Sequence, residues 1–573
     1  MTVNWKNKIL AYLHDPPDKA YDFGPRHQER ANAYCNCVLG QGEWQKHEPD
    51  WEAAAADRFI FPNGKKVNQA GLESLGEGVQ FRHPFSSHLL ESSYFPSTDQ
   101  AGEWISDVLP NFDESMLDPA FTLFALWRCW LPFAAQHATG KAQNAVYLPY
   151  LPADTRAPDS TIWHHNAVVS ALEGTRGADG KLHSAFFLFQ LGPVQDFIAQ
   201  AVSTRDLWSG SYLLSWLMAH AIQAVTDQLG PDAIIFPSLR GQPLFDWLHK
   251  EHLKKAKYPG SKSFWEDLDL PKAQNLVMTP NLPNRFLALV PEDFKPDDVE
   301  EALKEEWKLI ADTCRGLLDT KAHPFTGDQH ALWNFQVDHF WQPTWQLWPW
   351  HDAERTLELL KTLPAGNAAP LEAVKAAAAA IPAEHQDERC FPVKPLIPGW
   401  AWSGLYQLLS HRLDARRQTR EFKAWQSGET VSGRIKDALS GREEAVTDEK
   451  WYEAANKDHE IAHLFRHEHA LGAVNLVKRV WHKAYLSKRG LNRAKSSFDS
   501  VPAVAAAPWV KILKTKLAET RVFESFKKFA DKVEACKPVM DFDLPSSDLL
   551  QTQRYDQWLD QVDAAVFQPS EWD

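Results

Sequence analysis

A histidine and an aspartate stand side by side near the amino end of the chain. His14 and Asp15 follow a segment, 4–13, whose apolar residues recur at helical spacing, and Pro16 and Pro17 come next. An imidazole nitrogen beside a carboxylate oxygen suits a divalent transition ion such as Mn, Fe, Ni or Zn. The two prolines would stiffen the turn that carries the pair. A lone His-Asp dipeptide is common, so a structural role is the alternative.

Further candidates for the same chemistry lie downstream. Asp50 and Asp57 fall in HEPDWEAAAADRFIFP, seven residues apart on a predicted helix. That spacing places both on one helix face, two turns apart. Asp57 precedes an arginine, and an ion pair is the alternative to ligation. His83 in FRHPFS and His165 in TIWHHNAV are also candidates. For these two the alternatives are a packing or capping role and a surface position.

The elements that position these residues are organised around 185–219. The string AFFLFQL, 185–191, is apolar except for one glutamine and predicts a buried strand. Gly-Pro ends it, and helical spacing follows over 194–202. The segment after Ser211 is apolar nearly all round, which predicts a helix inside a large protein. With further strands at 233–236 and 285–290, the pattern is ferredoxin-like β-α-β-β-α-β.

Several strings resemble one family, the large subunit of type III CRISPR effector complexes in its Cmr-type (III-B-like) form. LGPVQDFIAQA and TRDLWSGSYLLS resemble its first palm domain, as do FPSLRGQPLFDWL and PNRFLALVP. LHDPPDKA and LPADTRAPDSTIWHH resemble the two ends of its HD-nuclease domain, and HEHALGAVNLVKRVW and SSFDSVPAVAAAP resemble its later helical segments. Three positions depart from the family pattern: Val202 stands where Arg is expected, His164 where Asp is expected, and Ser160 where His is expected.

The resemblance implies a circularly permuted HD domain that binds one or two divalent transition ions, Mn or Ni. Its ligands would be His14, Asp15, Asp50 and His165, with Asp57 and His83 as further possibilities. The first two would carry catalysis. The activity implied is metal-dependent cleavage of single-stranded DNA, in which the ion activates a water and stabilises the phosphodiester charge.

Two groups of arginines are candidates for contact with RNA or with partner subunits. Arg240 lies in the RGQP loop, for which a plain turn is the alternative. Further along, SGLYQLLSHRLDARRQTREF predicts a helix with a basic side suited to phosphates or to acidic neighbours. The arginines of that side are Arg412, Arg416, Arg417 and Arg420.

Two features of the family are missing from the sequence. Where the family has a zinc-binding Cys-x2-Cys turn, this chain reads GETVSGR, 428–434, so no structural zinc is expected. A second palm with a Gly-Gly-Asp-Asp motif is not found in the 573 residues. We therefore expect no cyclic oligoadenylate synthesis by this chain.

Composition bounds the remaining possibilities. A length of 573 residues predicts several domains, and 44% hydrophobic with 24% charged residues is typical of a globular protein. A net charge of −14 argues against a protein that coats nucleic acid over its whole surface. Neither a membrane span nor a signal peptide is predicted, and six scattered cysteines fit a reducing cytoplasm.

The expected architecture is α+β and mostly helical. A permuted HD-type helical domain is predicted over 1–173, a first, ferredoxin-like palm over 181–295, and a C-terminal helical domain without the zinc cysteines over 397–573. The intervening 296–396 is expected to be helical as far as 350 and then Ala/Pro-rich. The tryptophan-rich 333–350 is interpreted as a helix-packing or subunit interface, with stacking on nucleic-acid bases as the alternative.

The function implied is a large-subunit component of an RNA-guided antiviral ribonucleoprotein. It would scaffold the region around the guide RNA's 5′ end and meet guide and target RNA through backbone and small subunits. Single-stranded DNA and a separate palm-containing polypeptide are further implied partners. Two alternatives stay open: a scaffold that hydrolyses nothing, and a stand-alone HD-domain phosphohydrolase.

Overall fold

The protein divides into two compact units in a computed structural model. The first comprises Met1–Val194, Tyr212–Asp312 and Val337–Thr430, and the second Gln195–Ser211, Thr313–Gln336 and Val431–Asp573. The structure describes residues 3–21, 26–40, 48–57, 80–82, 89–91, 98–106, 118–138, 143–153, 160–257, 262–270, 272–364, 366–379, 401–419, 435–465, 470–491, 505 and 508.

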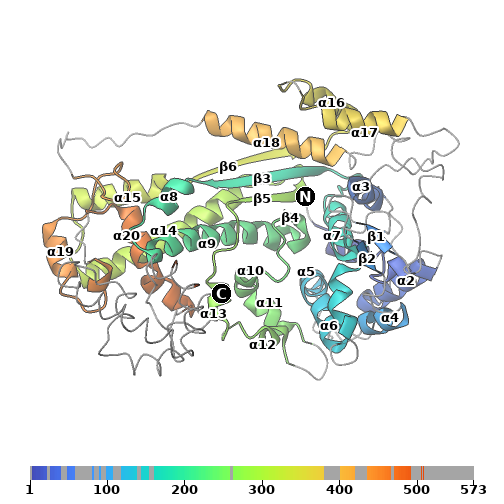
Figure 1. The fold of residues 1–573 in the computed structure, drawn as a ribbon, viewed down its shortest axis with the longest axis horizontal. Coiled ribbons are helices and arrows are strands. Elements are labelled where there is room, and N and C mark those ends of the chain that lie inside the picture. The colour runs from blue at the N-terminus through green and yellow to red at the C-terminus, as the bar shows by residue number, and fades with distance from the viewer. Residues whose placement is uncertain are drawn as a thin grey trace, which may run out of the picture. The chain divides into compact units, whose positions relative to one another are not determined.

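Helices dominate, and the expected mostly helical α+β class is confirmed (Figure 1). In the amino-terminal third the helices are α1 (Trp5–Tyr12), η1 (Lys19–Tyr21), α2 (Arg26–Leu39), α3 (Glu48–Asp57), α4 (Thr98–Ser106), α5 (Pro119–Ala125), η4 (Leu126–Trp130), α6 (Leu131–Ala138), η5 (Gln143–Tyr150) and α7 (Ile162–Glu173). They continue with α8 (Gln195–Ala199), α9 (Thr204–Leu229), η6 (Pro231–Ala233), α10 (Pro243–Leu248), α11 (Lys250–Lys255), α12 (Phe264–Leu268), α13 (Gln274–Val277), α14 (Pro296–Lys321), α15 (Asp328–Phe340), α16 (Ala353–Leu360), α17 (Ala369–Ala379), α18 (Trp402–Gln418), α19 (Glu449–Ala455), η9 (Ala462–Leu464), α20 (Ala473–Ala484) and η10 (Leu486–Arg489).

A four-stranded antiparallel sheet, counted over the described residues, forms the centre of the first unit. Its order is β4 (Ile234–Phe236), β5 (Arg285–Pro291), β3 (Ser184–Gly192) and β6 (Gln342–Pro349). β3 lies between two partner strands, and its side chains are apolar because they are buried on both faces of the sheet. The predicted strands at 185–191, 233–236 and 285–290 are confirmed. A separate hairpin pairs β1 (Gln80–Arg82) with β2 (Leu89–Glu91).

The prediction that the chain is helical from 296 to 350 is wrong for its last part. Residues 342–349 form strand β6, which pairs with β3 in a register that sets Trp348 opposite Phe186. The tryptophans of this segment therefore belong to a sheet edge, where aromatic residues are favoured. The sheet thus continues beyond residue 295, the expected end of the palm.

Helices cover both faces of this sheet (Figure 1). On one face, α18 packs along β3 and β6, and Trp402 lies edge-on to Phe186 with ring centroids 4.7 Å apart. On the other face, Phe187 meets Phe294 at 5.3 Å, and the Trp345 indole donates to Glu300 of α14 at 3.2 Å. The alternation of these contacts follows from the two-residue period of a strand.

The second unit brings together parts of three of the strings that resemble the family, LGPVQDFIAQA, TRDLWSGSYLLS and HEHALGAVNLVKRVW. The Lys478 ammonium of α20 donates to the Phe197 and Gln200 carbonyls at 2.5 and 2.8 Å. Asp206, from the RDLW string, forms a buried ion pair with Arg479 at 3.3 Å. These strings hold the unit together, and Asp206 is committed to a structural pair.

Among the described helices, none is both long and apolar enough to cross a membrane.

Candidate metal centre

His14 and Asp15 occupy the turn that ends α1. The Asn4 side chain caps the helix start by accepting from the Asn7 amide at 3.1 Å, and the helix stops at Tyr12, shortly before the two prolines. His14 Nδ1 lies 2.7 Å from the Ala11 carbonyl oxygen. A carbonyl can only accept, so Nδ1 carries a proton and Nε2 is directed to the interior as the ligand atom.

Helix α7 brings His165 to the same place. Its start is capped by Thr161, whose side chain accepts from the His164 amide at 3.2 Å. Helical spacing then leaves His164 exposed and His165 buried. His164 stands at the position where the resemblance predicts Asp. Because this position is exposed, the change from Asp to His lies outside the centre. The Asn166 side chain donates to the Asp15 carbonyl at 2.9 Å and ties α7 to the turn.

Asp50 comes from the first turn of α3, which also packs against α7. Arg176, just past the end of α7, pairs with Glu173 at 2.8 Å and with Glu48 of α3 at 3.1 Å. This double contact fixes the start of α3 relative to α7. Asp50, two residues after Glu48, is thereby held facing His165.

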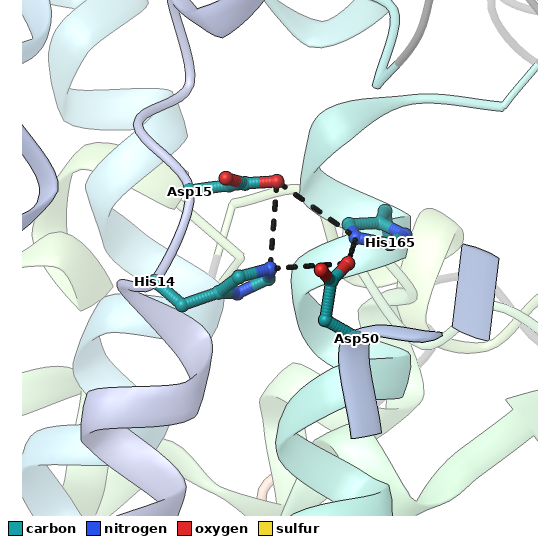
Figure 2. A group of neighbouring side chains, drawn as sticks. All are labelled: His14, Asp15, Asp50 and His165. Atoms are coloured by element: carbon teal, nitrogen blue, oxygen red, sulfur yellow. Dashed lines mark hydrogen bonds and ion pairs between the residues drawn. The ribbon is translucent and has the colours of Figure 1, made fainter. Parts of the chain in front are cut away.

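The four side chains converge (Figure 2). Their ligand atoms all lie within 4.8 Å of one another. His14 Nε2 is 3.4 Å from Asp15 Oδ2 and 3.6 Å from Asp50 Oδ1, while His165 Nε2 is 3.2 Å from Asp50 Oδ1. Bonds of about 2.1 Å to one ion place neighbouring ligands about 3.0–3.4 Å apart. Two imidazoles and two carboxylates at these separations fit a divalent transition ion.

Burial strengthens the electrostatic interactions among the four side chains of the centre. Asp50 is 27% exposed, whereas the other three side chains are 5 to 7% exposed. Burial alone would lower the pKa of His14, but the carboxylates of Asp15 and Asp50 outweigh it and raise that pKa to about 9. Burial likewise opposes ionisation of both aspartates. The cations around them prevail, chiefly Lys19 and His14 at Asp15 and the two histidines at Asp50, so both pKa values are lowered.

Two of the predicted additional ligands cannot be placed. Asp57 ends α3, seven residues after Asp50 on the same helix as expected, but its side chain lies outside the described residues. His83 lies outside them as well. Their ligation stays a prediction.

Arg240, considered from the sequence as a contact for RNA or a partner, makes several contacts within the protein, and its contact with RNA stays a prediction. Its guanidinium donates to the Tyr12 hydroxyl, the Trp163 carbonyl and the Trp127 carbonyl, each at 3.1 Å. Tyr12 and Trp163 each stand two residues before a centre histidine. Arg240 therefore braces α1 and α7, because its Nε and Nη2 donate to acceptors on both of these segments and on Trp127.

The structure describes three of the four arginines predicted to form the basic side of helix α18. Arg412, Arg416 and Arg417 are exposed, and the Arg412 guanidinium lies 4.0 Å from the centroid of the Trp348 ring. Arg420 and the 428–434 segment, where no zinc is expected, lie outside the described residues.

Sequence reasoning missed Lys19, whose ammonium donates to Asp15 Oδ2. The lysine stands four residues after Asp15 in LHDPPDKA, and the tight turn at the prolines is the signal that would have brought the two together.

Comparison with known proteins shows which proteins this chain is similar to. Residues 186–312 match the family model described as CRISPR-associated protein Cmr2, N-terminal. The Cmr2 subunit of the Cmr system of Pyrococcus furiosus is 27% identical over 352 residues, which is 53% of this chain and 37% of that protein. Cmr2 of Saccharolobus solfataricus is 29% identical over 208 residues, 32% of this chain and 19% of that protein. The chain is similar to Cmr2.

Solved structures agree in fold. A chain of the cryo-EM structure of type III-B Cmr-beta in the apo state has a TM-score of 0.60 at 15% identity, covering 90% of this chain and 55% of that one. A chain of Cmr-beta bound to cognate target RNA has a TM-score of 0.51 at 17% identity, covering 90% of this chain and 54% of that one. This protein thus spans about half the length of the Cmr-beta chains and less of the curated Cmr2 proteins.

Proposed function

We propose that this protein is a large-subunit component of a type III-B CRISPR effector and that its His14 centre is a divalent-metal-dependent nuclease for single-stranded DNA. The observation that carries the nuclease proposal is the convergence of two imidazoles and two carboxylates from three separate helical segments. The similarity to Cmr2 supports the assignment to the effector.

The chain's own groups define what the centre does. His14, Asp15, Asp50 and His165 hold the ion, and the Asn166 and Arg176 contacts keep the ligand-bearing turn and helices fixed. A divalent ion at such a site lowers the pKa of a bound water and stabilises the charge that develops on a phosphodiester. The more exposed side of the centre, at Asp50, is the side from which we expect the DNA to enter.

We also retain the basic end of α18 as a contact for RNA or for a partner subunit. Arg412, Arg416 and Arg417 are exposed there, and the stacking of Arg412 on Trp348 holds one guanidinium in a fixed orientation. Guide and target RNA, carried by backbone and small subunits, are the partners we propose, and one of the structurally similar chains comes from Cmr-beta bound to cognate target RNA.

A scaffold without hydrolytic activity is the second candidate. The family-model match over 186–312 contains strands β4 and β5 and most of β3 but none of the four ligands of the centre, so that match and the nuclease proposal rest on different parts of the chain. The two can be tested separately.

The decisive experiment measures cleavage of a labelled single-stranded oligonucleotide by purified protein in Mn²⁺ or Ni²⁺, and metal binding by calorimetry. Asp15→Asn and His165→Gln should abolish both, because each removes a ligand. His164→Ala is the matched control, since it changes the exposed neighbour on the same helix, and should leave both unchanged. Metal binding without cleavage, with guide and target RNA supplied, would favour the scaffold.

We further propose that this chain makes no cyclic oligoadenylate. Two aspartates follow strand β3 in the sequence, and each is engaged in a separate ion pair. Asp206 pairs with Arg479, and Asp196 pairs with Arg442 at 2.7 Å. Two-metal chemistry on ATP needs paired carboxylates. Incubation with ATP, Mg²⁺ and matched RNAs should give no oligoadenylate by mass spectrometry. Products sensitive to Asp196→Ala or Asp206→Ala would contradict this.

A further inference from the structure

Lys19 lies against the oxygen that a metal ion at this centre would need. Its ammonium donates to Asp15 Oδ2, the same oxygen that is 3.4 Å from His14 Nε2 and 3.9 Å from His165 Nε2. The lysine begins the short helix η1, where its amide donates to the Pro16 carbonyl at 2.9 Å. Its side chain is 21% exposed, against 5% for Asp15, so the lysine reaches solvent where the carboxylate hardly does.

We propose that Lys19 is the phosphate-binding group of the centre and that, without metal, its ammonium takes the place of the ion at Asp15. This proposal rests on the proposed nuclease function and names the group that receives the scissile phosphate. Two cations cannot share one carboxylate oxygen without strong repulsion at this burial. Metal binding at Asp15 would therefore displace the ammonium from that oxygen and free it to contact a phosphate.

The charges of the loaded centre match this role. A divalent ion with two carboxylate ligands and two neutral imidazole ligands has a net charge of zero. Lys19 then adds one positive charge. A phosphodiester linkage carries one negative charge, so the loaded centre and the substrate are complementary. A lysine ammonium on a flexible four-carbon stem is a compact point charge that can follow a phosphate as it docks.

A supporting lysine would behave differently. If Lys19 served only to orient Asp15, its removal would weaken metal binding, as loss of a group that positions a ligand does by about 10- to 100-fold. If it competes with the ion, its removal must tighten metal binding. The sign of the change separates the two roles without reference to activity.

The experiment compares Lys19→Met and Lys19→Arg with wild type, and uses Lys6→Met as the matched control, an exposed lysine on α1. Calorimetry with Mn²⁺ should show Lys19→Met binding about tenfold more tightly, as expected for loss of one nearby positive charge. Binding of a labelled, phosphorothioate-linked single strand to the Mn²⁺-loaded protein, followed by anisotropy, should weaken about tenfold in Lys19→Met. Lys19→Arg should retain it in part, and Lys6→Met should match wild type in both assays.

Unchanged or weaker Mn²⁺ binding by Lys19→Met, with a circular dichroism spectrum like that of wild type, would overturn the proposal. Unchanged affinity for the oligonucleotide would overturn it equally. If Lys19→Met does not fold, Lys19→Gln removes the charge while keeping a donor, and the same outcomes apply. Wild type that binds Mn²⁺ and cuts no DNA would refute the nuclease function, while the affinity comparison would still decide the role of Lys19.

Discussion

A proton must leave His14 before an ion can bind there, and this makes metal affinity depend on pH. The carboxylates around His14 raise its pKa to about 9 in the metal-free protein. At pH 7 the ring is then neutral about 1% of the time, and freeing Nε2 costs about 3 kcal/mol. Both aspartates have lowered pKa values and stay ionised over this range. The apparent affinity should therefore rise about tenfold for each pH unit up to about 9.

Calorimetric titration with Ni²⁺ between pH 6.5 and 8 tests this slope. Repeating each titration in two non-coordinating buffers of different ionisation enthalpy gives the number of protons released, and we expect about one per ion. His14→Gln should bind Ni²⁺ more weakly and lose most of the pH dependence. His164→Ala, which removes the exposed histidine next to the centre, should keep the wild-type slope.

An affinity that does not change with pH, together with no proton release, would refute the reasoning. The stability of the metal-free protein offers an independent check with the opposite slope. Because the folded pKa of His14 lies above its ordinary value of 6.5, the stability that it contributes is complete below about pH 6.5 and is lost as pH rises through about 9. Thermal melts without metal should follow this decline, while Ni²⁺ should stabilise more at higher pH.

Three further changes test the framework around the centre. Arg128→Met breaks a buried two-point ion pair with Asp246, with donor distances of 2.7 and 2.6 Å, and should lower the free energy of unfolding by about 3–5 kcal/mol in urea titrations. Adding Asp246→Leu should recover much of that loss, and no recovery would argue against the pair. Arg240→Met should cost about 3 kcal/mol and also weaken Ni²⁺ binding, because it frees both ligand-bearing helices. An unchanged Ni²⁺ affinity would show that this brace does not position the histidines. Asp206→Asn should destabilise the second unit by about 3 kcal/mol through Arg479 and leave Ni²⁺ binding unchanged. A matching loss of Ni²⁺ binding would contradict the separation of that pair from the centre.

The sequence alone determined the local features of this protein. The apolar run 185–191, short, rich in aromatic residues and ended by Gly-Pro, predicted a buried strand, and β3 confirms it. The prolines after Asp15 placed a turn just beyond the end of α1, and the resemblance of the TIWHH string to the family singled out His165, not His164, as a ligand. Each of these depends on neighbours within a few residues along the chain.

Tertiary structure decided what those features do together. His165 and Asp50 are 115 residues apart in sequence, and they meet because α7 packs against both α1 and α3. Strand β6 was missed because pairing with β3, and not its own composition, makes residues 342–349 extended. Arg240 reads as a loop cation in the sequence, and only packing shows that it donates to the two ligand-bearing helices. Likewise, the partner of Lys19 depends on the turn at the prolines, which sets its ammonium against Asp15.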